Sequence, residues 1–370
     1  MRENILEDSK KFFLNQIDKL IVDMDGCIPG SQTKAYHYLP TGGKEWTDGF
    51  WGGMLNLAYE YSGYDKYKEE ALKQVDILYD RIIRKDAVDH HDMGFLYSPS
   101  CLAAYDLYQS EKGLEAAVLA ADNLISRFRE KGEFIQAWGA MDNNPNSYRL
   151  IIDCLLNLPL LYRVSEITGK NIYKEIAEKH FRTAVKCVIR EDYSTNHTYY
   201  FDMKTGAPLK ATTVQGYSDD SMWARGQGWG IYGLALNYKY LKDDSILEKF
   251  NGVTNAFFKQ LPEDKIPYWD MIFTEGNEPR DTSAASIAIC GILEMEKYHP
   301  TPEFKGKAME MLEALLEHQI TDSQKGSNSL VMNSMYNRKA GHQPESSIWG
   351  DYYAMEALHR SQNPKWKAYW

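Results

Sequence analysis

The sequence lacks the features of several large protein classes. Its five cysteines are scattered along 370 residues and none forms a CxxC pair, so neither a zinc site nor a disulfide framework is predicted. No apolar run reaches the 18 residues that suggest a membrane-spanning helix. The net charge is −10 and no basic patch occurs, which disfavours nucleic acid and anionic membrane surfaces as partners.

Motifs for common cofactors are also missing. There is no P-loop, GxGxxG or GxSxG element, and no cofactor is predicted. The first residues are polar and lead into an amphipathic helix rather than a signal peptide, so we expect a cytoplasmic protein. Nothing in the sequence indicates an oligomeric state.

Aromatic residues, by contrast, are abundant, with 26 Tyr, 13 Phe and 9 Trp. Several Trp residues stand beside Gly and Asp instead of inside apolar runs. Aromatic planes next to polar groups suit sugar rings, although surplus core aromatics would give the same count.

A two-helix unit recurs along the chain. Each copy opens with polar and aromatic residues, continues into an apolar helix rich in small residues, and after a short turn ends in an amphipathic helix. The third copy holds Asp153, and the other openings lie at residues 46–51, 89–95, 223–230, 280–285 and 346–352. The sixth copy lacks its second helix, and an unpaired amphipathic helix at residues 3–23 precedes the first.

This recurrence predicts an all-α fold, an (α/α)6 barrel formed as a single domain by residues 1–370. The apolar helices make the inner layer and the amphipathic helices the outer layer. Antiparallel hairpins place all the polar openings at one end, where they form one mouth. Residues 190–222 predict a β-hairpin-like excursion, and residues 262–279 and 321–345 predict polar loops at the same mouth, to which we assign no chemistry.

Asp153 is a candidate proton donor. Residues 149–161 are interpreted as one apolar helix with this carboxylate near its start. Desolvation there raises the pKa of a carboxyl group toward neutral pH, which suits a general acid. The alternative is that Asp153 caps the helix or pairs with a buried Arg.

Asp92 begins the neighbouring inner helix, and two carboxylates facing one cleft are typical of glycoside hydrolysis. One would be protonated and the other ionised if their environments differ. The alternative is a pair of helix N-caps. The run Asp89-His90-His91-Asp92 could suggest a metal, but four consecutive residues cannot easily reach one ion, so no metal is predicted and His91 is given a positioning role.

Further residues are candidates for substrate binding. Arg225 offers a cation for a sugar carboxylate, with a salt bridge to a neighbouring Asp as the alternative. His197 and Gln215 lie on the insert after the third unit. Five Trp residues near the helix openings are candidates for sugar stacking, with core packing as the alternative: Trp46, Trp138, Trp223, Trp229 and Trp349.

Motifs in order along almost the whole chain resemble the unsaturated glucuronyl hydrolases, glycoside hydrolase family 88. They are Glu45-Trp46-Thr47-Asp48-Gly49-Phe50-Trp51, Asp89-His90-His91-Asp92-Met93-Gly94-Phe95, Gln136-Ala137-Trp138-Gly139, Ile151-Ile152-Asp153-Cys154-Leu155-Leu156-Asn157, Trp223-Ala224-Arg225-Gly226-Gln227-Gly228-Trp229-Gly230, Arg280-Asp281-Thr282-Ser283-Ala284-Ala285 and Ile348-Trp349-Gly350-Asp351-Tyr352-Tyr353. The resemblance implies the same barrel.

It also implies that the substrate is a lyase-generated glycosaminoglycan fragment whose non-reducing end is a uronate with a C4=C5 double bond. By this resemblance Asp153 protonates C4 and then helps water to add at C5, while Asp92 holds ring hydroxyls and tunes Asp153. His197 and Gln215 match water- and substrate-binding positions, and Arg225 with Trp229 matches substrate contacts.

Two departures leave the fine specificity open. Val214 stands where some family members carry a His, and no clear Ser/Lys pattern for reading sulfate appears near the C-terminus. Three other functions stay possible at this point: an unsaturated galacturonyl hydrolase, a conventional inverting uronidase that uses Asp92 and Asp153, and a non-catalytic glycan-binding barrel.

Overall fold

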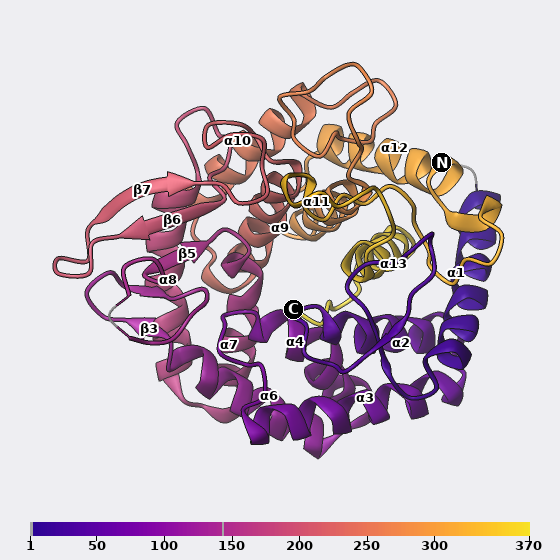
Figure 1. Ribbon diagram of the computed structural model, residues 1–370, viewed down its shortest axis with the longest axis horizontal. Helices are drawn as coiled ribbons and strands as arrows, with labels where there is room; N and C mark the ends of the chain where they lie inside the picture. Colours follow the sequence, from indigo (N-terminus) through magenta and orange to yellow (C-terminus); the bar gives the residue numbers. More distant parts are fainter. Residues whose placement is uncertain (1–2, 143) are drawn as a thin grey trace.

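The computed structural model describes residues 3–142 and 144–370, which form a closed double ring of helices (Figure 1). Consecutive inner helices contact one another around the ring, and the last contacts the first. The inner ring is α2 (Asp48–Ser62), α4 (Met93–Tyr97) with its π-helical continuation (Ser98–Leu102) and α5 (Ala103–Tyr108), α7 (Cys154–Thr168), α9 (Ala224–Leu241), α11 (Thr282–Met295) and α13 (Ile348–Gln362).

The outer ring is α1 (Glu3–Met24), α3 (Asp65–Arg84), α6 (Glu111–Ile125), α8 (Asn171–Val188), α10 (Ser245–Lys259) and α12 (Pro302–His318). The helix at the start of the chain, α1, packs against α12 and α13 and so fills the outer position that the sixth unit lacks. The (α/α)6 barrel predicted from the repeats is therefore confirmed.

Burial explains the two layers. Every residue of α11 is buried, whereas α3 buries only the face that carries Tyr67, Ala71, Val75 and Leu78. A helix that is apolar on all sides is stable only when it is covered on all sides, as in the inner ring. None of the described helices is both long and apolar enough to cross a bilayer.

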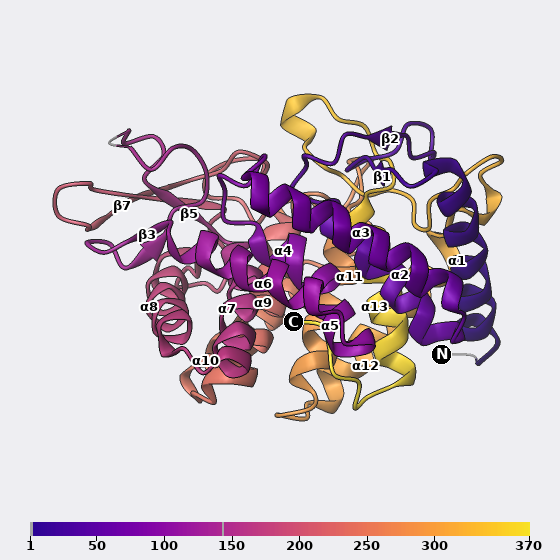
Figure 2. The same ribbon diagram turned by 90° about the horizontal axis from the view of Figure 1, so that it is seen from below.

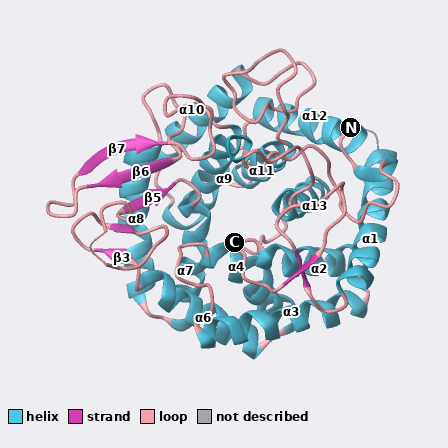
Figure 3. Ribbon diagram, viewed as in Figure 1, coloured by secondary structure: helices cyan, strands magenta, loops and turns pink. Residues whose placement is uncertain are grey.

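Short strands and loops gather at one end of the barrel (Figure 2), and Figure 3 marks these strands in magenta against the cyan helices. The predicted excursion is a hairpin of β6 (Thr198–Phe201) and β7 (Pro208–Thr212). Two small antiparallel pairs, β1 (Ile28–Pro29) with β2 (Pro40–Thr41) and β3 (Phe128–Arg129) with β4 (Phe134–Ile135), complete the strands around it. The 321–345 loop contains two 3₁₀ turns, Thr321–Ser323 and Arg338–Ala340.

One sequence-based assignment is wrong. Residues Arg149–Ile151 form a strand, β5, that pairs antiparallel with β6, and the helix α7 begins only at Cys154. Ile151 lies opposite Thr198 in this sheet. A short apolar run rich in β-branched residues fits a strand as well as a buried helix, and here the partner strand decides between them.

Candidate active site

A cavity of about 440 Å³ opens at the end of the barrel where the inner helices begin. Its walls come from the segments that precede α2, α4 and β6, from the end of β5 and from the loops that follow β4, β7 and α12. The lining residues are Lys44, Glu45, Trp46, Ala87, Asp89, His90, Asp92, Trp138, Ile151, Asp153, His197, Gln215 and Tyr336. Six of the candidate residues therefore meet at the predicted mouth: Trp46, Asp92, Trp138, Asp153, His197 and Gln215.

Asp153 is held at this mouth by the small sheet. The Ile152 N–H donates to the His197 carbonyl over 3.0 Å, just after β5, and the chain then turns into α7. Asp153 and Asp92 occupy the N-cap positions of α7 and α4, but neither side chain accepts a capping hydrogen bond. Neither carboxyl group therefore makes the hydrogen bond that the capping alternative requires, and Oδ2 of Asp92 instead lies 3.1 Å from Nδ1 of His90.

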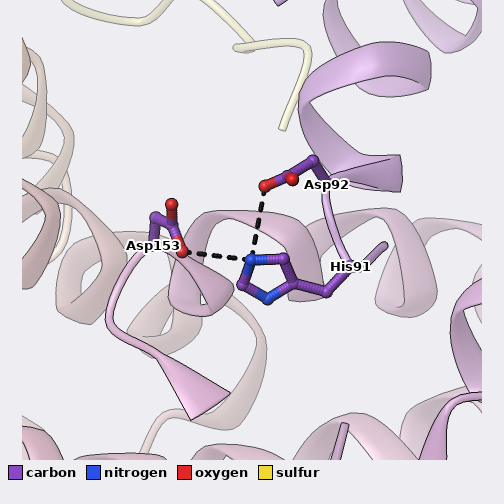
Figure 4. A group of neighbouring side chains, drawn as sticks. All are labelled: His91, Asp92 and Asp153. Atoms are coloured by element: carbon purple, nitrogen blue, oxygen red, sulfur yellow. Dashed lines mark ion pairs between the residues drawn. The ribbon is translucent and has the colours of Figure 1, made fainter. Parts of the chain in front are cut away.

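A buried imidazole lies between these two carboxyl groups (Figure 4). The Nε2 atom of His91 is 3.3 Å from Oδ1 of Asp153 and 3.4 Å from Oδ1 of Asp92. The His91 side chain is 1% exposed, whereas Asp153 keeps 18% of its side chain exposed toward the cavity. His91 thus lies against both carboxyl groups, and its positioning role stays a prediction.

The two carboxyl groups have opposite pKa shifts. Burial and the charge of Asp92 raise the pKa of Asp153 well above its ordinary value, against the opposing effect of Arg225. Burial also acts to raise the pKa of Asp92, but His91, His90 and Arg127 outweigh it and lower that pKa. Burial lowers the pKa of His91 to about 4, so this imidazole is neutral at pH 7. Asp153 is accordingly the proton-bearing member of the pair and Asp92 the ionised member.

His197 reaches the cavity from the loop before β6. Its Nδ1 accepts a hydrogen bond from the Val214 N–H over 3.0 Å, so a neutral ring carries its hydrogen on Nε2. Burial, together with Arg225 and Arg149, lowers the pKa of His197 to about 3. The ring is therefore neutral and its Nε2–H is left to donate to a water or a sugar hydroxyl.

Arg225 lies beneath the cavity and does not line it. Its guanidinium donates to Asp281 over 2.9 Å and to the Met335 carbonyl over 2.7 Å, and also to Gln215 and to the Tyr336 carbonyl. The predicted contact of Arg225 with a sugar carboxylate is thus replaced by the alternative, a buried salt bridge. Its role is to hold Gln215 and the 335–336 segment in place at the cavity wall.

The candidate Trp residues fall into two groups. Trp46 and Trp138 line the cavity, and Trp138 is 36% exposed. Trp223, Trp229 and Trp349 are 5%, 1% and 0% exposed and do not line it. A buried Trp ring has no free face on which a sugar can stack. The expectation that all five Trp residues stack on substrate is therefore corrected for Trp223, Trp229 and Trp349. Trp229 packs instead on Phe95 and Tyr353.

The sequence model of Glycosyl Hydrolase Family 88 matches residues 20–366. The chain belongs to glycoside hydrolase family 88. An unsaturated chondroitin disaccharide hydrolase of Streptococcus pneumoniae is 48% identical over 333 residues, which cover 88% of this chain and 84% of that protein. The assignment to the family, and with it the class of enzyme, is confirmed.

Solved structures of family 88 enzymes match the whole barrel. The crystal structure of an unsaturated glucuronyl hydrolase from Streptococcus agalactiae superposes with a TM-score of 0.97 at 44% identity, covering 100% of this chain and 94% of that one. An aspartate-to-asparagine mutant of the S. agalactiae enzyme, complexed with dGlcA-GalNAc6S, superposes with a TM-score of 0.88 at 42% identity, covering 99% of this chain and 93% of that one.

Two parts of this family 88 site were missed from the sequence. Tyr336 lines the cavity from the 321–345 loop, and its hydroxyl accepts a hydrogen bond from Trp46 Nε1 over 3.1 Å. Lys44 lines the rim next to the Glu45-Trp46 motif and pairs with Asp86. Neither residue belongs to a helix opening, to the 190–222 insert or to one of the family motifs, the three signals that revealed the other candidates.

Proposed function

We propose that the protein removes the non-reducing-end 4,5-unsaturated glucuronic acid from lyase-generated glycosaminoglycan oligosaccharides. The observation that carries this proposal is the pair of carboxyl groups at the mouth, each 3.3–3.4 Å from the same buried imidazole nitrogen, with the pKa of Asp153 raised and that of Asp92 lowered. The same residues, 1–370, are proposed to act as one catalytic domain.

The reaction begins with proton transfer. The substrate is a vinyl ether, and its C4 carbon is nucleophilic because the ring oxygen donates electrons into the double bond. Asp153 gives its proton to C4, and positive charge develops at C5 and the ring oxygen. The ionised Asp92 lies beside Asp153 and stabilises this charge. A raised pKa is what a donor active near neutral pH requires.

Water then adds at C5. The carboxylate left on Asp153 takes one proton from the water as the oxygen attacks, which regenerates the acid. Nε2–H of His197 and the side chain of Gln215, which both line the cavity, are placed to orient that water or the sugar hydroxyls. The resulting hemiketal opens to a ketone, and the hemiacetal left at C1 releases the neighbouring sugar.

The relatives support the substrate class. The matching relatives include an unsaturated chondroitin disaccharide hydrolase and an unsaturated glucuronyl hydrolase, and one matching structure holds dGlcA-GalNAc6S.

The conventional inverting mechanism fits the site poorly. It needs the two carboxyl groups about 6.5–9.5 Å apart so that a water fits between the base and the sugar. The facing oxygen atoms of Asp92 and Asp153 lie within 4.8 Å of one another. This spacing leaves too little room for that water.

The test is to follow the absorbance of the unsaturated uronate while the protein acts on lyase-generated chondroitin or hyaluronan disaccharides. We expect the band to disappear, and in D₂O we expect deuterium at C4 of the product. A stable band with both glucuronate and galacturonate substrates would contradict the proposal. Release of sugar without deuterium at C4 would instead establish ordinary glycoside hydrolysis.

A cytoplasmic location is part of the same proposal. The exposed thiol of Cys27 and the four buried thiols are unpaired, as is usual for proteins of a reducing compartment. Cell fractionation followed by immunoblotting tests this, and recovery of the protein outside the cytoplasmic fraction would contradict it.

A further inference from the structure

We propose that His91, Asp92 and Asp153 form a binding site for Zn²⁺, and that the ion inhibits the enzyme by occupying its two carboxyl groups. The part of this inference that concerns inhibition rests on the proposed function, whereas the binding site itself does not.

The distances match a metal site. Nε2 of His91 lies 3.3 Å from Oδ1 of Asp153 and 3.4 Å from Oδ1 of Asp92 (Figure 4). Ligand atoms bound to tetrahedral Zn²⁺ at about 2.0–2.1 Å are separated from one another by roughly 3.3–3.4 Å. The imidazole nitrogen can therefore share an ion with each carboxylate oxygen. The two carboxylate oxygens lie up to 4.8 Å apart, so one carboxyl group must rotate toward the other for all three atoms to bind the same ion.

The same distances are long for direct hydrogen bonds, which for N–H···O span about 2.7–3.2 Å. Both nitrogens of His91 and Oδ1 of Asp153 are buried without a hydrogen-bond partner among the described residues. Buried polar atoms without a partner cost free energy, and those of a native protein call for an explanation. An ion between Nε2 and the two carboxylates would satisfy two of these atoms at once.

An ion can reach this point. Asp92 and Asp153 line the cavity, and His91 lies behind them. The approach is therefore from the mouth, over the carboxylates and onto the imidazole. Three protein ligands leave a fourth position open for water, as in zinc sites that are not purely structural.

The chemistry of the three ligand side chains favours Zn²⁺ over other divalent ions. One imidazole and two carboxylates suit Zn²⁺, whereas Mg²⁺ and Ca²⁺ require more oxygen ligands and larger coordination shells. The sequence alone argued against a metal because Asp89-His90-His91-Asp92 are consecutive. The fold supplies the missing ligand, Asp153, from the next inner unit.

A carboxylate that is bound to Zn²⁺ cannot deliver a proton to C4, and the ion also fills the place of the reacting sugar. We therefore expect inhibition that is competitive with the disaccharide, reversed by EDTA, and not produced by the same concentration of Mg²⁺. Initial rates across a grid of Zn²⁺ and disaccharide concentrations measure this.

Binding is measured separately, by titrating ZnCl₂ into metal-free protein in a calorimeter. We expect one strong site in the wild type, and at least tenfold weaker binding in His91→Gln and in Asp153→Asn. The matched control is His318→Gln, which removes a surface imidazole on α12 that is 70% exposed and should leave binding unchanged. Circular dichroism of each variant shows whether it is folded, and either of the two site variants suffices for the comparison.

Each outcome is decisive. Absence of a strong site in the wild type, or equal affinity in a folded His91→Gln or Asp153→Asn variant, overturns the binding site. If the variants lose Zn²⁺ binding but Zn²⁺ does not slow turnover of the disaccharide by the wild type, the proposal that the ion inhibits the enzyme is overturned. A protein that binds Zn²⁺ at this site but never consumes an unsaturated disaccharide overturns the proposed function and leaves the binding site standing.

Discussion

Gly94 of α4 lies directly against Asn157 of α7. A Cβ atom on Gly94 would stand 2.4 Å from the Asn157 Cα, and the Phe95 N–H donates to the Asn157 side chain over 3.0 Å. The same side chain donates to the carbonyl of Asp153 over 3.2 Å. Gly94 follows Asp92 by two residues, so this close approach fixes how near the two carboxyl groups can lie.

We therefore predict that Gly94→Ala separates the two inner helices. The added methyl meets backbone that cannot move away cheaply, and overpacking of this kind costs about 1–3 kcal/mol. Activity should fall further than stability, because Asp92 and Asp153 move apart. Gly306→Ala is the matched control: on α12 nothing lies within 4 Å of its Cβ, and it should stabilise by about 0.4–1 kcal/mol. Chemical denaturation and disaccharide turnover measure both, and a fully active Gly94→Ala enzyme would contradict the argument.

Asp153→Asn should keep the fold and lose turnover by about 10²–10⁴-fold, the range for losing a general acid. The amide is nearly isosteric with the protonated carboxyl group but cannot transfer its proton. Asp80→Asn, on the outer face of α3 and 60% exposed, serves as the control. Activity of Asp153→Asn within tenfold of the wild type would show that another group donates the proton.

The raised pKa of Asp153 also predicts a pH-dependent difference in stability. The unfolded chain releases this proton above about pH 4, whereas the folded protein retains it. The stability that the protonated form provides is complete below that pH and is lost as the pH rises toward the raised pKa. Asn cannot ionise in either state, so Asp153→Asn should melt above the wild type at pH 7 and close to it at pH 4. A melting-temperature difference that is constant with pH would show that the pKa is not raised.

The two groups of Trp residues predict different mutant behaviour. Trp138→Ala removes an exposed ring from the cavity wall and should raise KM with little change in stability. Trp229→Ala removes a ring that is packed on Phe95 and Tyr353, and should lower the free energy of unfolding by about 3–5 kcal/mol. Steady-state kinetics and urea denaturation of both variants separate the two effects. A stable Trp229→Ala protein with a raised KM would place Trp229 in the binding site after all.

The salt bridge beneath the cavity gives a further prediction. Asp281→Asn leaves the guanidinium of Arg225 buried without its counter-charge, which typically costs about 3–5 kcal/mol. Since Arg225 also holds Gln215, substrate binding should weaken in the protein that remains folded. An unchanged melting temperature would show that the carbonyls of Met335 and Tyr336 suffice to hold Arg225.

The ring and the pair Asp92 and Asp153 could be predicted from the sequence because a repeated unit places its openings at one end. The direction in which each side chain points could not be predicted from the sequence. Trp229 stands five residues after the start of α9, whose first turns are covered on every side, so its ring could equally have faced the mouth or the core. Tyr336 reaches the site from a loop without periodicity, and β5 is recognised only through its partner strand.

The packing of α1 on α12 and α13 has a consequence for unfolding. Open solenoids of helical hairpins have end repeats with one neighbour each, and disorder can spread inward from them. In this barrel Gln362 of α13 donates to Glu7 of α1, and each hairpin has a neighbour on both sides. No hairpin is a free edge from which fraying can begin. The ring must open as a unit, and the residues at its mouth keep their spacing until it does.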